Sequence, residues 1–212
     1  MSAEVVGILL AAGASSRFGA DKLLHPLPGG VPLVVAAARN LVEVLPASIA
    51  VVRPDASELA DRLSECGLVL VVNPRAGDGM GASIASGVSA AAGARGWIVA
   101  LGDMPWVRPG TVARIVDALD GGASIVRPAY RGRAGHPVGF SRGHFAALAG
   151  LRGAAGARSV VDATITGKLL LDVDDPGVLR DVDRRADLTA ERVQVDSSTD
   201  ADDGPGNFGE SL

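Results

Sequence analysis

A glycine-rich segment, residues 13–22, follows an apolar run and carries the clearest chemistry in this sequence. Gly13 and Gly19 permit backbone dihedrals that point successive N–H groups at one anion. Arg17 and Lys22 add two positive charges to the same segment. Because such groups bind phosphate through charge-assisted hydrogen bonds, the segment predicts a phosphate site. An ordinary strand-to-helix turn with two surface cations is the alternative.

The order of residues in this segment disfavours two common nucleotide-binding loops. It has neither the G-x-x-x-x-G-K-[ST] order of a P-loop nor the G-x-G-x-x-G order of a dinucleotide-binding fold. Of the 20 lysines and arginines in the chain, only Lys22 and Lys168 are lysines. A lysine in an arginine-rich chain indicates that a compact ammonium suits this position, although two lysines can also arise by chance.

A carboxylate, Asp103, stands just after another apolar run, in Gly102-Asp103-Met104-Pro105. A carboxylate at the carboxyl end of a buried strand is well placed to hold Mg²⁺ beside a triphosphate. Mg²⁺ usually takes one or two carboxylates together with phosphate oxygens. The alternative is that Asp103 is a turn residue before Pro105.

The pattern Leu10-Ala11-Ala12-Gly13-x-Ser15-x-Arg17-Phe18-Gly19-x-x-Lys22 resembles the signature of the MobA/MocA-like molybdenum cofactor nucleotidyltransferases. The resemblance covers roughly residues 5–188. It implies that Leu10, Ala11, Ala12, Gly13, Ser15 and Lys22 bind the NTP triphosphate and base. It also implies that Arg17 and Lys22 stabilise charge at the reacting phosphates. The Gly-Asp-x-Pro pattern is similar to that family's metal site, so Asp103 is expected to bind Mg²⁺, with Mn²⁺ as an alternative.

A second metal ligand, Asp183, is implied by the same resemblance. Asp181-Val182-Asp183 resembles the family's closing D-x-[DN] segment, which usually continues into Thr-Pro-Glu-Asp-Leu. Here Arg184-Arg185 replaces the Thr-Pro, which is a departure from the family pattern. A further acidic cluster, formed by Asp172, Asp174 and Asp175, precedes Pro176-Gly177 and is expected to be a solvated turn.

Three other side chains complete the expected site. Asn73 and Ser83 belong to a stretch that resembles the cytidylyltransferase pattern N…GMxxS, which implies nucleotide contacts. Helix capping is an equally good explanation for Ser83. His136, in Gly135-His136-Pro137-Val138, resembles the segment that lines the acceptor pocket and is expected to bind the pterin phosphate. A lone histidine is nevertheless more often structural.

The resemblance implies transfer of CMP from CTP to the phosphate of molybdopterin, with release of pyrophosphate. Cytidylyltransferases of the family read Leu-Ala-Ala-Gly, as here, whereas guanylyltransferases tend to read Leu-Ala-Gly-Gly. One methyl group is worth about 1–3 kcal/mol, so Ala12 predicts a preference only. The alternatives are a guanylyltransferase, a sugar-1-phosphate or methylerythritol-phosphate nucleotidyltransferase, and a non-catalytic nucleotide- or cofactor-binding module.

Short apolar runs that alternate with helix-like stretches position these side chains. Strands are expected at 5–10, 48–52, 68–72, 97–101, 123–126, 136–140 and 169–173. Helices are expected at 33–45, 57–66, 82–92, 109–119, 142–151 and 183–193. This order predicts an α/β fold, a mostly parallel twisted sheet flanked by helices. The resemblance makes it Rossmann-like, of the nucleotide-diphospho-sugar transferase (GT-A) type, and the change of rhythm after residue 126 predicts a small antiparallel insertion.

Composition sets the remaining expectations. With 212 residues and 48% hydrophobic residues, we expect one domain over residues 1–195. Residues 196–212 hold five acidic and no basic side chains, so we expect a disordered acidic tail. Removing those five charges from the total of −4 leaves a nearly neutral body, which disfavours nucleic-acid and membrane binding. One cysteine and no leader-like start favour the cytoplasm. A transient contact with a molybdoenzyme or its chaperone is also implied by the resemblance.

Overall fold

The structure, a computed structural model, describes residues 4–13 and 22–188. Its centre is an eight-stranded sheet with the order β3-β2-β1-β4-β7-β5-β6, in which β8 also pairs with β5. The strands are β1 (Val5–Leu10), β2 (Ile49–Val52), β3 (Val69–Val72), β4 (Gly96–Leu101), β5 (Ile125–Tyr130), β6 (Arg133–Ala134), β7 (Val138–Ser141) and β8 (Lys168–Asp172).

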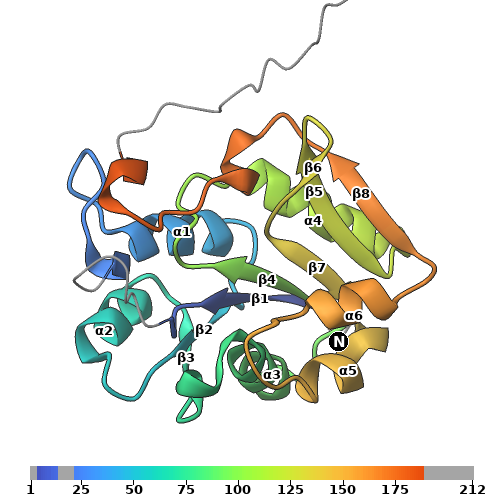
Figure 1. The fold of residues 1–212 in the computed structure, drawn as a ribbon, viewed down its shortest axis with the longest axis horizontal. Coiled ribbons are helices and arrows are strands. Elements are labelled where there is room, and N and C mark those ends of the chain that lie inside the picture. The colour runs from blue at the N-terminus through green and yellow to red at the C-terminus, as the bar shows by residue number, and fades with distance from the viewer. Residues whose placement is uncertain (1–3, 14–21, 189–212) are drawn as a thin grey trace, which may run out of the picture.

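The helices among the described residues connect these strands. They are α1 (Leu33–Val42), α2 (Ser57–Glu65), α3 (Met80–Ala90), α4 (Pro109–Asp120), α5 (Phe145–Ala149) and α6 (Arg158–Ala163). Figure 1 shows α1 and α4 on one side of the sheet and α3, α5 and α6 on the other. Pro109 occupies the first turn of α4, where its missing N–H costs nothing.

Strand direction confirms the mostly parallel α/β sheet. β3, β2, β1 and β4 run parallel to one another. β7 is antiparallel to both β4 and β5, so β5 runs in the same direction as β4, and β8 is parallel to β5. The antiparallel strand β7 is therefore part of the main sheet, between β4 and β5, while β6 forms a short hairpin with β5.

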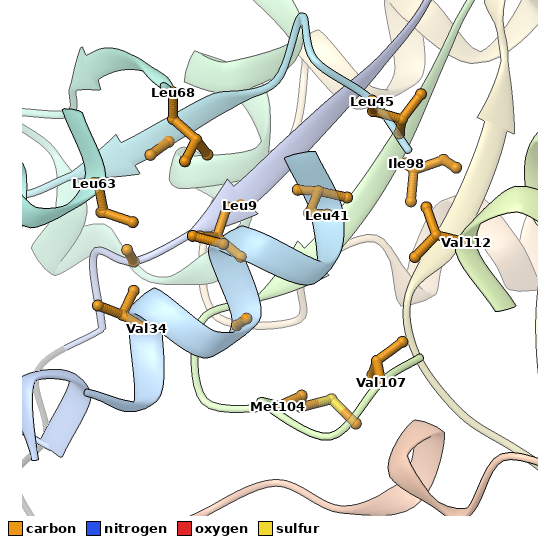
Figure 2. Close-up of a cluster of buried hydrophobic side chains, with 14 of the residues drawn as sticks. Leu9, Val34, Leu41, Leu45, Leu63, Leu68, Ile98, Met104, Val107 and Val112 are labelled. Carbon is orange, nitrogen blue, oxygen red and sulfur yellow. The ribbon is translucent and has the colours of Figure 1, made fainter. Parts of the chain in front are cut away.

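Buried side chains lie on both faces of the sheet, which explains why the strands are continuously apolar. One cluster joins β1 and β4 to α1, α2 and α4; Figure 2 shows Leu9 of β1 close to Val34 and Leu41 of α1. The other cluster joins the opposite face to α3, α5 and α6, and includes Trp97 and Phe140, both fully buried. Core packing on both faces stabilises the sheet. The carboxyl ends of its parallel strands lie at one edge because these strands run in the same direction.

One expectation about the C-terminal half is corrected, and two short elements there were not expected. The expected terminal helix at 183–193 is absent from its described part: residues 183 and 184 are irregular, and Arg185–Leu188 forms only a short 3-10 helix. Helix α6 and strand β6 were not anticipated, because both are short and lack a clear hydrophobic period. The expected tail and the end of the expected domain lie outside the described residues.

Within the described ranges, no helix combines the length and the apolar character needed to cross a bilayer.

Candidate active site

The carboxyl ends of β1 and β4 meet in register and form the edge on which the site is built. Leu10 of β1 lies opposite Leu101 of β4, and the Gly102 N–H donates to the Leu10 carbonyl oxygen at 3.0 Å. A Cβ at position 102 would lie only 3.1 Å from that oxygen, so glycine permits this close approach. Asp103 therefore leaves β4 beside the start of the glycine-rich segment.

Lys22 brings two distant carboxylates together. Its Nζ lies 2.8 Å from Asp103 Oδ2 and 3.3 Å from Asp183 Oδ1. The Lys22 side chain is 11% exposed, whereas that of Asp183 is 49% exposed. Burial disfavours the charged ammonium, but the hydrogen bonds and negative charges of the two aspartates outweigh it, so the pKa of Lys22 is raised. Lys22 is therefore a fixed positive charge at neutral pH.

Val182 delivers Asp183 to this position. The Val182 N–H donates to the carbonyl oxygen of Asp103 at 3.0 Å. The Val182 side chain is fully buried in a cluster with Leu33 of α1. One backbone hydrogen bond and one buried side chain therefore attach the C-terminal segment to the end of β4.

Asp187, which the sequence analysis did not assign to the site, orients Asp183. Its Oδ2 accepts hydrogen bonds from the N–H of Asp183 at 2.9 Å and from the N–H of Arg184 at 2.7 Å. Short polar side chains close turns by accepting from nearby backbone N–H groups. The sequence could have indicated this role of Asp187, because it is an acidic residue four positions after Asp183.

Asp103 and Asp183 suit a divalent cation. Both present an oxygen atom to one cationic group, here the ammonium of Lys22. In the ranges 4–13 and 22–188, no three His, Cys, Asp or Glu side chains converge well enough to hold a metal ion. A cation at this pair would complete its ligands with phosphate or water oxygens, which is how Mg²⁺ is usually held. The donor set therefore fits a metal bound together with a triphosphate.

A third carboxylate, Asp181, lies within electrostatic range of Lys22, Asp103 and Asp183. Burial raises the pKa of Asp181, and the negative charges of Asp103 and Asp183 raise it further. A backbone hydrogen bond and the charge of Lys22 act in the opposite direction without cancelling the effect. Asp181 therefore takes up a proton more readily than an exposed aspartate does.

The described start of the glycine-rich segment lies beside β2. Ala11 and Ala12 are buried, whereas Gly13 is exposed and its carbonyl oxygen accepts from Arg53 Nη1 at 3.3 Å. The backbone beyond β1 is thus accessible at Gly13. Ser15 and Arg17 lie outside the described residues, and their expected phosphate contacts stay predictions.

Asn73 and Ser83 contact each other. Asn73 Nδ2 donates to Ser83 Oγ at 3.1 Å, and Asn73 Oδ1 accepts from the Arg75 N–H at 3.0 Å. Asn73 is 1% exposed and Ser83 is 5% exposed. The pair therefore ties the loop after β3 to the first turn of α3.

His136 lies in the turn before β7 and lines a pocket on one face of the sheet. Its N–H donates to the Val178 carbonyl at 2.9 Å, and a Cβ at Gly135 would collide with that carbonyl. The side-chain Nδ1 is buried without a hydrogen-bond partner. Burial and the positive charge of Arg127 lower the pKa of His136, although Asp103 has the opposite effect. The imidazole is therefore neutral at pH 7 and within electrostatic range of both residues.

Asp175 does not belong to a solvated turn, contrary to expectation. It is 2% exposed, while Asp172 and Asp174 are exposed as anticipated. Its carboxylate accepts from Thr111 Oγ1 at 2.6 Å and from the N–H groups of Arg108 and Gly177, both at 2.9 Å. A buried carboxylate is stable when its oxygens are hydrogen-bonded. Asp175 therefore links the start of α4 to the segment after β8.

The chain matches the model of the MobA-like NTP transferase domain over residues 7–169. That range begins within β1 and includes both Lys22 and Asp103. The chain belongs to this family. Membership of the MobA-like NTP transferase family confirms the resemblance seen in the glycine-rich segment, and makes the chain a member of a nucleotidyltransferase family.

Two curated relatives of this MobA-like chain differ in how much of them it covers. The chain is 32% identical over 188 residues to the nicotine blue oxidoreductase of Paenarthrobacter nicotinovorans. The match covers 84% of this chain and 92% of that protein. The chain is also 33% identical over 116 residues to the bifunctional protein GlmU of Roseobacter denitrificans, covering 52% of this chain. The chain spans about a quarter of GlmU, 26% of its length.

Solved structures of a similar protein have the same fold as this MobA-like transferase. Rv0371c from Mycobacterium tuberculosis H37Rv is 28% identical with a TM-score of 0.74, covering 88% of this chain and 96% of that chain. A complex of Rv0371c with manganese is 26% identical with a TM-score of 0.68 and the same coverage. A protein of similar sequence and fold has thus been solved with a divalent metal.

Proposed function

We propose that this MobA-like NTP transferase moves CMP from CTP to the phosphate of molybdopterin and releases pyrophosphate. The observation that carries the proposal is the convergence of Lys22, Asp103 and Asp183 at the carboxyl edge of the sheet. A buried positive charge beside two carboxylates suits binding of a triphosphate together with a divalent cation. Family membership supports an NTP as one substrate.

In this mechanism the terminal phosphate of the acceptor attacks the α-phosphorus of the NTP in line with the departing pyrophosphate. Arg17 and Lys22 neutralise the negative charge that develops on the phosphate oxygens. Asp103 and Asp183 would hold the divalent ion, Mg²⁺ or Mn²⁺, which would supply further positive charge to the triphosphate. Positioning and charge supply the rate enhancement, so no side chain of the protein needs to form a covalent intermediate.

Choice of base rests on Leu10-Ala11-Ala12-Gly13. The methyl group of Ala12 narrows the space available to a base, which favours a pyrimidine over a purine by about 1–3 kcal/mol. The Asn73–Ser83 pair shapes the nucleotide site through the loop that it ties to α3. A guanylyltransferase, or a transferase for sugar-1-phosphates or methylerythritol phosphate, would use the same cluster of charges with a different base or acceptor.

A second candidate function comes from one relative. The nicotine blue oxidoreductase matches 84% of this chain, a larger share than GlmU matches. Its name describes an oxidoreductase that acts on nicotine blue, so the second candidate function is electron transfer to a related coloured compound. The glycine segment lacks the G-x-G-x-x-G order of a dinucleotide fold, and we therefore place nucleotidyl transfer first.

The deciding experiment measures pyrophosphate release from CTP, GTP, ATP and UTP with Mg²⁺ and molybdopterin. The variants are Lys22→Ala and Asp103→Ala. The chain offers matched controls in Lys168→Ala, the other lysine, and Asp172→Ala, an exposed aspartate outside the site. We expect turnover that prefers CTP, a loss of about 100-fold or more in both site variants, and unchanged activity in both controls.

Two other outcomes would change the acceptor or the reaction assigned to this protein. Turnover with a sugar phosphate or methylerythritol phosphate, but none with molybdopterin, would retain the transferase chemistry and change the acceptor. No pyrophosphate from any NTP, together with bleaching of nicotine blue by a reduced nicotinamide dinucleotide, would reject the proposal in favour of the second candidate.

A further inference from the structure

A pocket of about 520 Å³ lies on the sheet face that also carries α3 and α6. Its walls combine an apolar part, which includes Ile84 of α3, Leu101 of β4 and Phe140 of β7, with polar side chains. The polar lining residues are Arg127, His136, Arg158 and Asp162. This volume is in the range of small-molecule sites, and apolar walls with few polar groups are typical of them. Two of its polar lining residues, Arg127 and His136, lack a hydrogen-bond partner at a buried nitrogen.

Arg127 is an unusual residue for its position. It stands in the middle of β5, where Val126 and Pro128 on either side are buried. Successive strand residues face opposite sides of a sheet, so Arg127 shares its face with Ile125, which belongs to the same core cluster as Phe140. That face is the one on which the pocket lies.

Among residues 4–13 and 22–188, no carboxylate forms an ion pair with Arg127. Its buried Nε also has no hydrogen-bond partner in that part of the chain. A guanidinium group presents several N–H donors in a planar fork that suits carboxylate, phosphate and sulfonate oxygens. A partly buried donor without a partner is costly unless a ligand or water completes it.

His136 connects this pocket to the Lys22–Asp103–Asp183 cluster. It lines the pocket, and it also lines a smaller cavity together with Leu101 and with Met104, the residue that follows Asp103. A neutral imidazole can donate one hydrogen bond and accept another. A ligand in the pocket could therefore contact Arg127 and His136 while its reactive end lies toward Asp103.

We propose that Arg127 is the specificity-determining residue of this pocket and binds an anionic group of a small acceptor, other than its reacting phosphate, while an apolar part of the acceptor packs on the apolar wall. The inference deepens the proposed function, because it assigns the pocket to the acceptor and states the acceptor's chemistry. A neutral compound of the same shape leaves the Arg127 guanidinium unmatched and binds more weakly.

The test uses two fluorescent probes that share one apolar body. 8-Anilinonaphthalene-1-sulfonate carries a single negative charge, and N-phenyl-1-naphthylamine lacks the sulfonate. Their affinities are measured by fluorescence titration on the full chain for the wild type and for Arg127→Gln, Arg127→Lys and Arg133→Gln. Arg133 is the matched control, because it is an exposed arginine of β6 that does not line the pocket. Circular dichroism confirms that each variant is folded.

We expect the wild type to bind the sulfonate probe more tightly than the neutral one. Arg127→Gln should weaken sulfonate binding by about 10- to 100-fold, the range for a charge-assisted hydrogen bond, and leave the neutral probe unchanged. Arg127→Lys should give an intermediate loss, because it keeps the charge without the fork. Arg133→Gln should match the wild type. Equal affinities of the two wild-type probes, or a preference that survives in Arg127→Gln, would overturn the inference.

The probe titrations contain neither NTP nor acceptor, so they are independent of catalysis. Where nucleotidyl transfer is also observed, Arg127→Gln should raise the KM of the acceptor and leave the KM of CTP unchanged. Loss of sulfonate binding in Arg127→Gln without turnover of any NTP would reject the proposed function while retaining the role of Arg127.

Discussion

Lys22 Nζ lies 2.8 Å from Asp103 Oδ2, although 81 positions separate the two residues in the chain. The parallel pairing of β1 and β4 places the segments that follow both strands at one edge of the sheet. The ammonium group also contacts Asp183 at 3.3 Å, so it occupies the position between two carboxylates where a divalent cation would bind. A divalent cation bound by both carboxylates in the absence of a nucleotide would therefore compete with Lys22 for the same oxygens.

Replacing Lys22 by methionine should strengthen metal binding to the nucleotide-free protein. Removal of a positive charge within 3.3 Å of both carboxylates eliminates this competition and should raise Mn²⁺ affinity by about tenfold, equivalent to about 1.4 kcal/mol. Titration of the electron paramagnetic resonance signal of free Mn²⁺ measures the effect. Lys168→Met is the control and should leave the affinity unchanged. Weaker Mn²⁺ binding in Lys22→Met would contradict the competition.

Asp187→Ala should weaken Mn²⁺ binding in the presence of CTP. Without Oδ2 of Asp187, the N–H groups of Asp183 and Arg184 lose their acceptor and the turn that orients Asp183 is released. Loss of such an indirect support typically costs about 10- to 100-fold in metal affinity. Asp187→Asn keeps an acceptor oxygen and should lose less. The same titration applies, and a variant that binds Mn²⁺ as the wild type does would show that Asp183 needs no support.

Ala12→Gly should relax the choice of base. Removing the methyl group widens the space beside the base, and one methyl group is worth about 10- to 200-fold in discrimination. We expect the ratio of kcat/KM for CTP to that for GTP to fall by at least about tenfold, mainly through a gain with GTP. Pyrophosphate release with each nucleotide measures the ratio. An unchanged ratio would place base selection elsewhere in the site.

The free energy of unfolding should fall as the pH decreases from 7.5 to 5.5, partly because of His136. Burial and the charge of Arg127 lower the pKa of His136, whereas the unfolded residue takes up a proton near pH 6.5. Between the lowered value and 6.5 the unfolded state binds more protons, so acid favours unfolding. Urea unfolding at several pH values measures the slope, and His136→Gln should make it shallower.

Burial also lowers the pKa of His144, so His144 contributes a separate part of the same slope. His144→Gln should reduce the pH dependence by its own share, and the double variant should be the least sensitive to acid. A His136→Gln protein with the wild-type slope would show that His136 takes up its proton normally in the folded state.

Most of the regular elements could be predicted because their signals are local. The strand expected at 5–10 is β1 with the same bounds, and the helix expected at 109–119 differs from α4 by one residue. Apolar runs and start signals such as Pro109 act over a few neighbouring residues. The helix expected at 183–193 was wrong in its described part, because Asp187 binds the backbone N–H groups of Asp183 and Arg184 in a turn.

The sequence by itself determined the α/β class, the family, and the residue types of the candidate site, since these depend on composition and on short motifs. Only the tertiary structure decided that Lys22 contacts both aspartates, which lie 81 and 161 positions away. It also decided that Arg127 lines a pocket and that Asp175 is buried. Such contacts depend on how strands pair and on which face each side chain occupies, and no local spacing encodes either.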